Sequence, residues 1–184
     1  MAQATMVKND VVDLLVAQHS QIRDLFAETM DSAGDRRKDA FRRLVRLLAV
    51  HETAEEEIVH PLARRSLPGG EGIVDDRLAE EREAKELLAE LDGMDVEDPR
   101  FLPKLDRLRI AVLTHARAEE RYEFYRLADE FDDSQRAALA RAVKAAEATA
   151  PTRPHPGTES ATANLLTGPV NAMVDRIRDI LRKG

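Results

Sequence analysis

Apolar residues recur at steps of three and four along several stretches of the chain, which is the spacing of one face of an α-helix. The first stretch follows Asp10, a residue type that caps helices, and ends where Gly34 interrupts the pattern. The second covers about 36–64, the third about 73–91, and the last begins near Leu102. The apolar positions of these stripes are Val12, Leu15, Ile22, Phe26; Phe41, Leu44, Leu48, Ile58, Leu62; Val74, Leu78, Ala84, Leu88, Leu91; and Leu105, Leu108, Val112.

These amphipathic helices, joined by short connections, predict an all-α fold: an antiparallel up-down-up-down four-helix bundle over residues 9–131. Residues 132–184 are predicted to form a C-terminal helical extension. Within it we expect a short helix over 135–148, a strap over 149–169 that is rich in Pro, Thr, Ala and Gly, and a final amphipathic helix over 170–181 that docks on the bundle.

One short pattern occurs twice, at His51 and at His115. Each histidine is followed by three residues and then by two glutamates, so Glu55 and Glu119 stand four positions after it. Four residues of an α-helix turn by about 40° beyond a full circle, which places the imidazole and the carboxylate on one face. Two such faces turned toward each other inside a bundle form a site for a pair of metal ions.

The other two bundle helices also carry a polar residue inside the apolar stripe, His19 in the first and Glu81 in the third. Burying one unpaired carboxylate costs several kcal/mol, so three together would offset the whole stability of a domain, about 5–15 kcal/mol. Metal ions neutralise such a cluster, and nitrogen and oxygen donors suit iron or manganese, with zinc as a further option. The candidate metal ligands are His19, His51, Glu55, Glu81, His115 and Glu119. The basic residues that offer an alternative neutralisation are Arg23, Arg82, Lys85 and Arg126.

Tyr122 and Glu52 are expected next to this cluster. Tyr122 lies seven positions after His115 and so returns to the same helix face, either as a core aromatic or as a proton or electron donor beside the metal. Glu52 flanks His51 and is a candidate supporting or bridging oxygen.

The remaining histidines and glutamates near the motifs are expected to lie elsewhere. His60 stands nine positions after His51, half a turn round an α-helix, so we expect it to point away from the interior and not to bind metal. Glu56 and Glu120 are expected to face solvent. His155 is expected to be a loop residue of the strap.

Composition narrows the class of function. The net charge of −7 argues against nucleic-acid binding, because phosphate contacts need a basic surface. No stretch approaches twenty apolar residues, and residues 1–8 lack the apolar core of a signal peptide, so we expect a cytoplasmic protein without membrane contact. The chain has no cysteine, which excludes disulfides, thiolate metal sites and cysteine nucleophiles.

Over residues 9–130 the chain resembles the hemerythrin-like (HHE cation-binding) family. The resemblance is carried by the stretch that ends at His19 in the first helix and by the two His-x-x-x-Glu-Glu motifs. It implies a non-haem di-iron centre in a four-helix bundle, with two oxo- or hydroxo-bridged iron ions. By position it implies that the ligands are His19, His51, Glu55, His115 and Glu119, with the two glutamates as bridges.

The third helix departs from the family pattern, because Glu81 stands where members commonly have a histidine. An added negative charge stabilises ferric over ferrous iron, which favours irreversible reduction of dioxygen over its reversible carriage. The leading hypothesis is therefore a di-iron redox protein that consumes dioxygen, peroxide or nitric oxide. The alternatives are a non-catalytic iron or dioxygen sensing or storage module, and a purely structural bundle with internal ion pairs. The sequence leaves the oligomeric state open.

Overall fold

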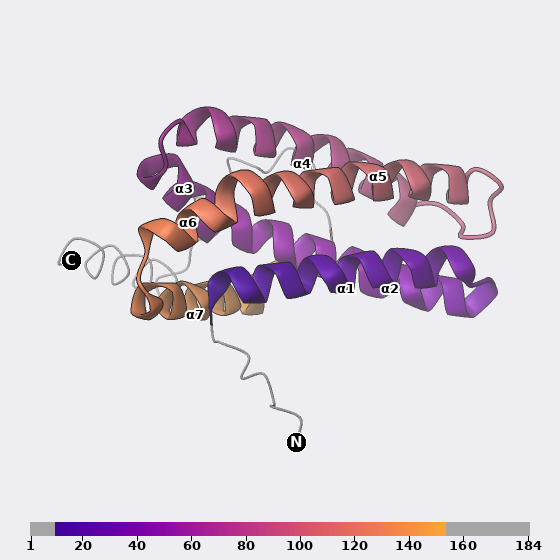
Figure 1. Ribbon diagram of the computed structural model, residues 1–184. Coiled ribbons are helices and arrows are strands. Elements are labelled where there is room, and N and C mark those ends of the chain that lie inside the picture. The colour runs from indigo at the N-terminus through magenta and orange to yellow at the C-terminus, as the bar shows by residue number, and fades with distance from the viewer. Residues whose placement is uncertain (1–9, 154–184) are drawn as a thin grey trace, which may run out of the picture.

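The computed structural model describes residues 10–153, and within them every regular element is a helix. Helices α1 (Val11–Asp31) and α2 (Gly34–Ala54) form one antiparallel pair, while α4 (Gly70–Asp92) and α5 (Phe101–Glu119) form a second pair packed against it (Figure 1). This arrangement confirms the predicted antiparallel four-helix bundle.

The second and fourth long helices are each interrupted by one π-helical segment. Helix α2 passes through η1 (Glu55–Val59) into α3 (His60–Ser66), and α5 passes through η2 (Glu120–Phe124) into α6 (Tyr125–Glu130). The His60 N–H donates to the Glu55 carbonyl and the Tyr125 N–H to the Glu120 carbonyl, five residues back in each case. A π segment adds one residue to a turn, so side chains beyond it are rotated from the positions of an uninterrupted α-helix.

Polar side chains cap the first residues of α1 (Val11–Asp31) and of α7 (Asp133–Thr149). The Asp10 carboxylate accepts a hydrogen bond from the Val12 N–H at the start of α1. Asp132 and Gln135 form a complete capping box at the start of α7 (Asp133–Thr149). Both caps satisfy N–H groups that have no partner within the helix, which explains why these helices begin where they do.

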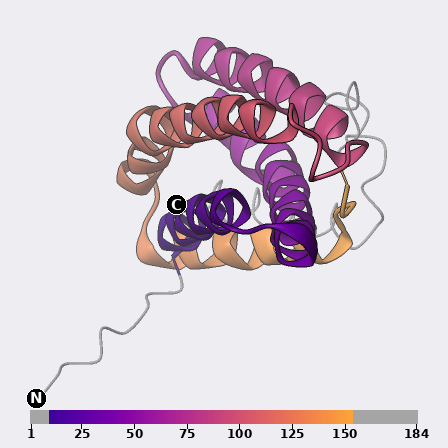
Figure 2. The same cartoon turned by 90° about the vertical axis from the view of Figure 1, so that its right-hand side faces the viewer.

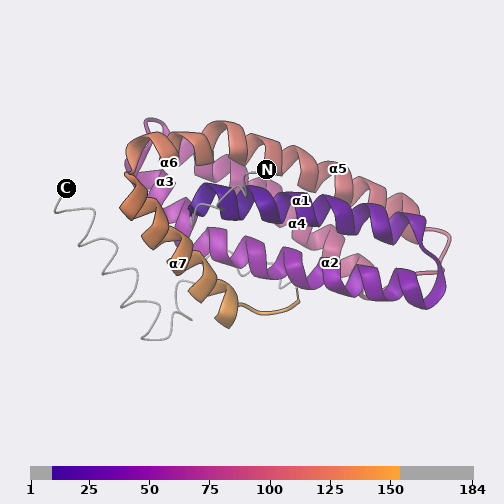
Figure 3. The same ribbon diagram turned by 60° about the horizontal axis from the view of Figure 1, so that its bottom comes forward.

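Helix α7 corresponds to the helix predicted over 135–148. It lies across the outer face of α1 and α2 instead of running parallel to them (Figures 2 and 3). Leu139, Val143 and several alanines of α7 are buried in this contact. The predicted final helix over 170–181 and His155 lie outside the described residues.

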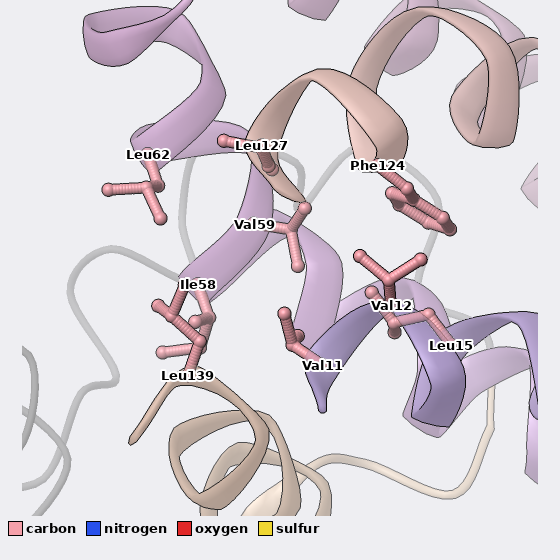
Figure 4. A pocket seen from close by; sticks show the side chains of 9 residues that line it. All are labelled: Val11, Val12, Leu15, Ile58, Val59, Leu62, Phe124, Leu127 and Leu139. Carbon is pink, nitrogen blue, oxygen red and sulfur yellow. The ribbon is translucent and has the colours of Figure 1, made fainter. Parts of the chain in front are cut away.

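Two apolar clusters fill the interior, one at each end of the bundle. We call the cluster next to α7 the α7-side cluster and the one at the opposite end the far-end cluster. Between them lies a layer of buried ionisable side chains, which we call the polar layer. The α7-side cluster contains a small pocket with a wholly apolar wall (Figure 4). The polar layer is therefore enclosed between two regions of low polarity. Main members of the α7-side cluster are Leu15, Ile58, Val59, Phe124, Leu127, Leu139 and Val143; those of the far-end cluster are Ile22, Phe26, Leu44, Leu48, Leu88, Leu105 and Val112. The polar layer comprises His19, His51, Glu52, Glu55, His60, Glu81, His115, Glu119 and Glu123.

No helix within residues 10–153 has the length and apolar character needed to cross a lipid bilayer.

Two glycines of α4 provide a matched test of the packing between α3 and α4. A Cβ atom at Gly70 would lie 2.2 Å from the Ala63 carbonyl oxygen, whereas a Cβ at Gly72 meets nothing within 4 Å. We expect Gly70→Ala to lower the free energy of unfolding by about 1–3 kcal/mol through overpacking. We expect Gly72→Ala to raise it by about 0.5–1 kcal/mol, because alanine favours a helix over glycine. Denaturant unfolding measures both, and equal shifts of the same sign would contradict the close α3–α4 contact.

Candidate metal centre

All six ligands proposed from the sequence lie in the polar layer. His19 comes from α1, Glu81 from α4, and the two His-x-x-x-Glu pairs from the α2–η1 junction and from the end of α5. Each of the six residues is at most 7% exposed. The structure thus brings together the side chains that the two motifs and the stripes indicated, and their role as ligands stays a prediction.

The two His-x-x-x-Glu pairs bring imidazole and carboxylate atoms close together without forming hydrogen bonds. His51 Nε2 lies 3.3 Å from Glu55 Oε2, and His115 Nε2 lies 3.2 Å from Glu119 Oε1. His115 Nε2 and both carboxylate oxygens of Glu55 and of Glu119 are buried without a hydrogen-bond partner. Two atoms bound to one ion at about 2.1 Å, at a right angle, lie about 3 Å apart. The spacing therefore fits pairs of ligands for a common ion.

Glu119 faces two different imidazoles with its two oxygens. Its Oε1 lies 3.2 Å from His115 Nε2, while its Oε2 lies 3.3 Å from His19 Nε2. A carboxylate with one oxygen toward each of two nitrogen donors has the disposition of a bridge between two cations.

The outer nitrogen of every histidine in the polar layer is held by an oxygen atom. Ligating histidines commonly donate the second ring N–H to a carboxylate or amide oxygen, which fixes the ring and aims the other nitrogen at the metal. In each case Nδ1 is the outer nitrogen and Nε2 lies toward neighbouring carboxylates. The Nδ1 contacts are His19 to Glu120 at 2.9 Å, His51 to Gln18 at 2.9 Å, His60 to Glu123 at 2.9 Å, and His115 to Glu80 at 3.0 Å.

The pKa shifts reflect burial and the mixture of charges. Burial and the neighbouring Glu119 raise the pKa of Glu55 well above its usual value. Burial also opposes ionisation of Glu119, yet facing His115 and His19 outweighs it and lowers the Glu119 pKa well below the usual range. Burial and the adjacent His19 lower the pKa of His51 to about 3, so this imidazole is neutral near pH 7 and is free to act as a ligand.

Basic side chains neutralise only part of the layer. Lys85 Nζ lies 3.7 Å from Glu81 Oε2 and also pairs with Glu56. Arg23 and Arg126, which the sequence offered as alternatives, are exposed.

Despite burial, Glu81 and Glu123 raise the pKa of His60 well above its usual value, and Glu119 does the same for His115, so these imidazoles carry part of the compensating charge in the metal-free chain. The layer still holds five buried carboxylates, and both oxygens of Glu55 and of Glu119 have no hydrogen-bond partner, which is the composition of a cation site. The five are Glu52, Glu55, Glu81, Glu119 and Glu123.

The expectation that His60 points away from the interior is wrong. His60 is 2% exposed, its Nε2 lies 2.5 Å from Glu81 Oε1, and its Nδ1 lies 2.9 Å from Glu123 Oε1. The cause is η1, because the added residue brings His60 above Glu55 and back toward the inward face.

The expectation that Tyr122 lies on the inward face is also wrong. Tyr122 is 42% exposed, because η2 rotates the helix after Glu119. Glu123 and Phe124 occupy the interior instead, and the Phe124 ring stacks on the His19 ring with centroids 5.5 Å apart. The structure therefore places Tyr122 at the surface and not on the inward face, and its role beside a metal stays a prediction.

The neighbouring glutamates differ from expectation in part. Glu120 and Glu56 do not simply face solvent, since Glu120 accepts from His19 Nδ1 and Glu56 pairs with Lys85. Glu52 is buried beside the layer, and burial together with the nearby Glu81 raises its pKa to about 7.

Several residues of the site were missed by the sequence interpretation. Gln18 accepts from His51 and donates through its amide to Glu147 of α7, while Glu80 joins His115 to Arg77. These residues flank the inward stripes, where helical periodicity gives no indication of a contact. Glu123 was detectable, because the apolar stripe Phe124, Leu127, Phe131 is out of step with His115 and Glu119 by one residue.

Glu52 makes the stability of the metal-free protein depend on pH. Its pKa is about 7 in the folded chain against an ordinary 4.5, so between these values the folded state binds the extra proton. The free energy of unfolding should therefore fall as the pH rises through this window, with a contribution from Glu52 of about 3 kcal/mol. In Glu52→Gln that contribution should vanish. Urea unfolding of both proteins in chelator from pH 4.5 to 7.5 measures the difference, and identical pH profiles would contradict the burial of this carboxyl group.

Comparisons with known proteins agree with this geometry. The family model described as Hemerythrin HHE cation binding domain matches residues 10–128. A comparison with curated proteins finds no match. The crystal structure of a Hemerythrin HHE cation binding domain-containing protein, the Rv2633c homolog from Mycobacterium kansasii, is similar with a TM-score of 0.65 at 16% identity, covering 91% of this chain and 98% of that one. Because the family model spans well over half of the chain, this protein belongs to the hemerythrin HHE cation-binding family.

Proposed function

We propose that this protein binds two iron ions in the polar layer and reduces dioxygen, peroxide or nitric oxide there. The observation that carries the proposal is Glu119, whose two oxygens lie 3.2 Å and 3.3 Å from two different imidazoles. In a purely structural network these two contacts would be ion pairs, yet neither oxygen has a hydrogen bond, and coordination of two cations by this carboxylate accounts for that geometry.

The side chains divide into two groups around the bridging carboxylates. His19, His51 and Glu55 with Glu119 would hold one ion, since one atom of each lies within 4.8 Å of the others. Glu81 and His115 would hold the second ion, and Glu119 and Glu55 would bridge the pair. When bound, an iron pair would give electrons to small oxygen- or nitrogen-containing molecules as it passes from the ferrous to the ferric state, and an external reductant would return it to the ferrous state.

The surroundings favour consumption of the small molecule over its storage. The layer is enclosed by the α7-side and far-end clusters, which limit the access of water and strengthen electrostatic interactions inside. The excess of carboxylates stabilises the ferric state, and this favours electron donation by the ferrous pair. The same nitrogen and oxygen donors also accept manganese or zinc, so metal identity is part of the proposal.

The test compares two glutamates of α4 that lie on opposite faces. Glu81→Ala removes a buried candidate ligand, while Glu83→Ala changes an exposed residue of the same helix. In protein reconstituted with iron and supplied with ascorbate as the reductant, we expect the wild type and Glu83→Ala to hold about two iron ions and to turn over at least one of the three substrates. We expect Glu81→Ala to lose at least tenfold in rate, because the second ion loses a ligand.

Elemental analysis, optical spectra and stopped-flow kinetics with each substrate provide the measurements. Iron bound at two per chain without turnover of any substrate would overturn the redox proposal in favour of storage or sensing. Less than one ion per chain in the wild type would overturn the metal pair itself.

A further inference from the structure

We propose that His60 is a further ligand of the metal pair, a fourth imidazole that binds the ion next to Glu81 and His115 through Nε2. This inference rests on the metal pair of the proposed function and adds a residue that neither motif contains. Glu123 is then the outer partner that accepts a hydrogen bond from His60 Nδ1 and fixes the ring.

The distances place His60 on the border of the second ion's surroundings. His60 Nε2 lies 2.5 Å from Glu81 Oε1 and 4.0 Å from Glu119 Oε1. His115 Nε2, across from it, lies 4.0 Å from the same Glu81 oxygen and 3.2 Å from the same Glu119 oxygen. Ligand atoms on opposite sides of one ion, with bonds of about 2.1 Å, are about 4.2 Å apart. The separations of 3.2 Å and 4.0 Å therefore fit donors to a common ion. The 2.5 Å contact is a hydrogen bond of the metal-free chain, which His60 Nε2 would exchange for a bond to the ion.

His60 is held in the same manner as the three histidines proposed from the sequence. Its Nδ1 lies 2.9 Å from Glu123 Oε1, as the Nδ1 of His19 lies 2.9 Å from Glu120. Both His60 and Glu123 are almost wholly buried, at 2% and 0% exposure. A histidine with an anchored outer nitrogen and an inner nitrogen among carboxylates has the environment of a ligand.

The two π segments supply an independent argument. In an uninterrupted α-helix His60 would lie half a turn from His51. η1 brings His60 inward and η2 brings Glu123 inward, so the two interruptions together create the His60–Glu123 pair. π segments are rare and occur frequently at functional sites, and here each follows directly on a His-x-x-x-Glu motif.

The competing explanation is a salt bridge: a doubly protonated His60 held between Glu81 and Glu123 with no part in metal binding. The two explanations predict different effects when His60 is replaced by another positively charged side chain. Lysine at position 60 keeps a positive charge near both carboxylates but offers no imidazole. Glutamine keeps hydrogen bonding but offers neither the charge nor the ring.

The experiment measures iron per chain in His60→Lys and His60→Gln after reconstitution, with circular dichroism to show that each variant is folded. His155→Gln is the control, since it removes the chain's remaining histidine and leaves unchanged the nine residues that make up the polar layer. We expect about two ions in the wild type and in the control, and about one ion in both His60 variants. Two ions with unchanged affinity in either His60 variant would overturn the assignment.

A second measurement needs no variant. In cobalt(II)-loaded wild-type protein, each ligating histidine gives one strongly shifted, exchangeable ring N–H signal in the proton NMR spectrum. Four such signals would support His60 as a ligand, and three would overturn it. A wild-type chain that takes up fewer than two ions of either metal would instead count against the metal pair. The failure of this inference is therefore distinguishable from the failure of the proposed function.

Discussion

The neutralisation of buried carboxylates is the constraint on which this structure depends. Five glutamates share one layer, while Lys85 is the basic side chain whose contact with Glu81 the structure gives. Hydrogen bonds compensate only part of this charge, since His60 contacts Glu81 and Glu123 whereas both oxygens of Glu55 and of Glu119 lack hydrogen-bond partners among the described residues. Histidine nitrogens at 3.2–3.3 Å complete a set of donors that is stable around cations and costly without them. The apolar clusters on either side strengthen this requirement, since they keep out the water that would otherwise screen the charges.

The π segments show how a bundle with straight helices can concentrate so many polar groups in one layer. A regular α-helix has about one inward-facing residue in each turn. One helix can therefore contribute little more than a His-x-x-x-Glu pair to a single polar layer. A π segment adds one residue after the pair and rotates the following side chains, so one more of them faces the same layer. His60 follows η1 in this way, and Glu123 lies within η2. The same rotation moves Tyr122 to the surface and places Phe124 against His19, so the apolar boundary of the layer is set by the interruption as well.

Much of the fold followed from the sequence, because helical periodicity and caps are local properties. The long helices, the capping of α7 by Asp132 and the inward position of Glu81 were all within reach of that reasoning. The positions predicted for His60 and Tyr122 are wrong because they assume the rotation per residue of an uninterrupted α-helix, which η1 and η2 change. The sequence does contain one indication of the interruption, because the apolar stripe that begins at Phe124 is shifted by one residue from the helical spacing set by Glu119. Gln18 and Glu80 were not predictable in this way, since their contacts depend on how neighbouring helices pack. The division of the chain at residue 132 stays a prediction.

Two hydrogen bonds connect His51 through Gln18 to Glu147 and so join the polar layer to α7. The family model ends at residue 128, whereas Glu147 belongs to α7, which lies beyond it. The orientation of one imidazole at the centre is therefore tied to a helix that lies beyond the residues matched by the family model. A chimera that joined this bundle to another member's C-terminal region would inherit every candidate donor atom, yet it would change the outermost support of His51.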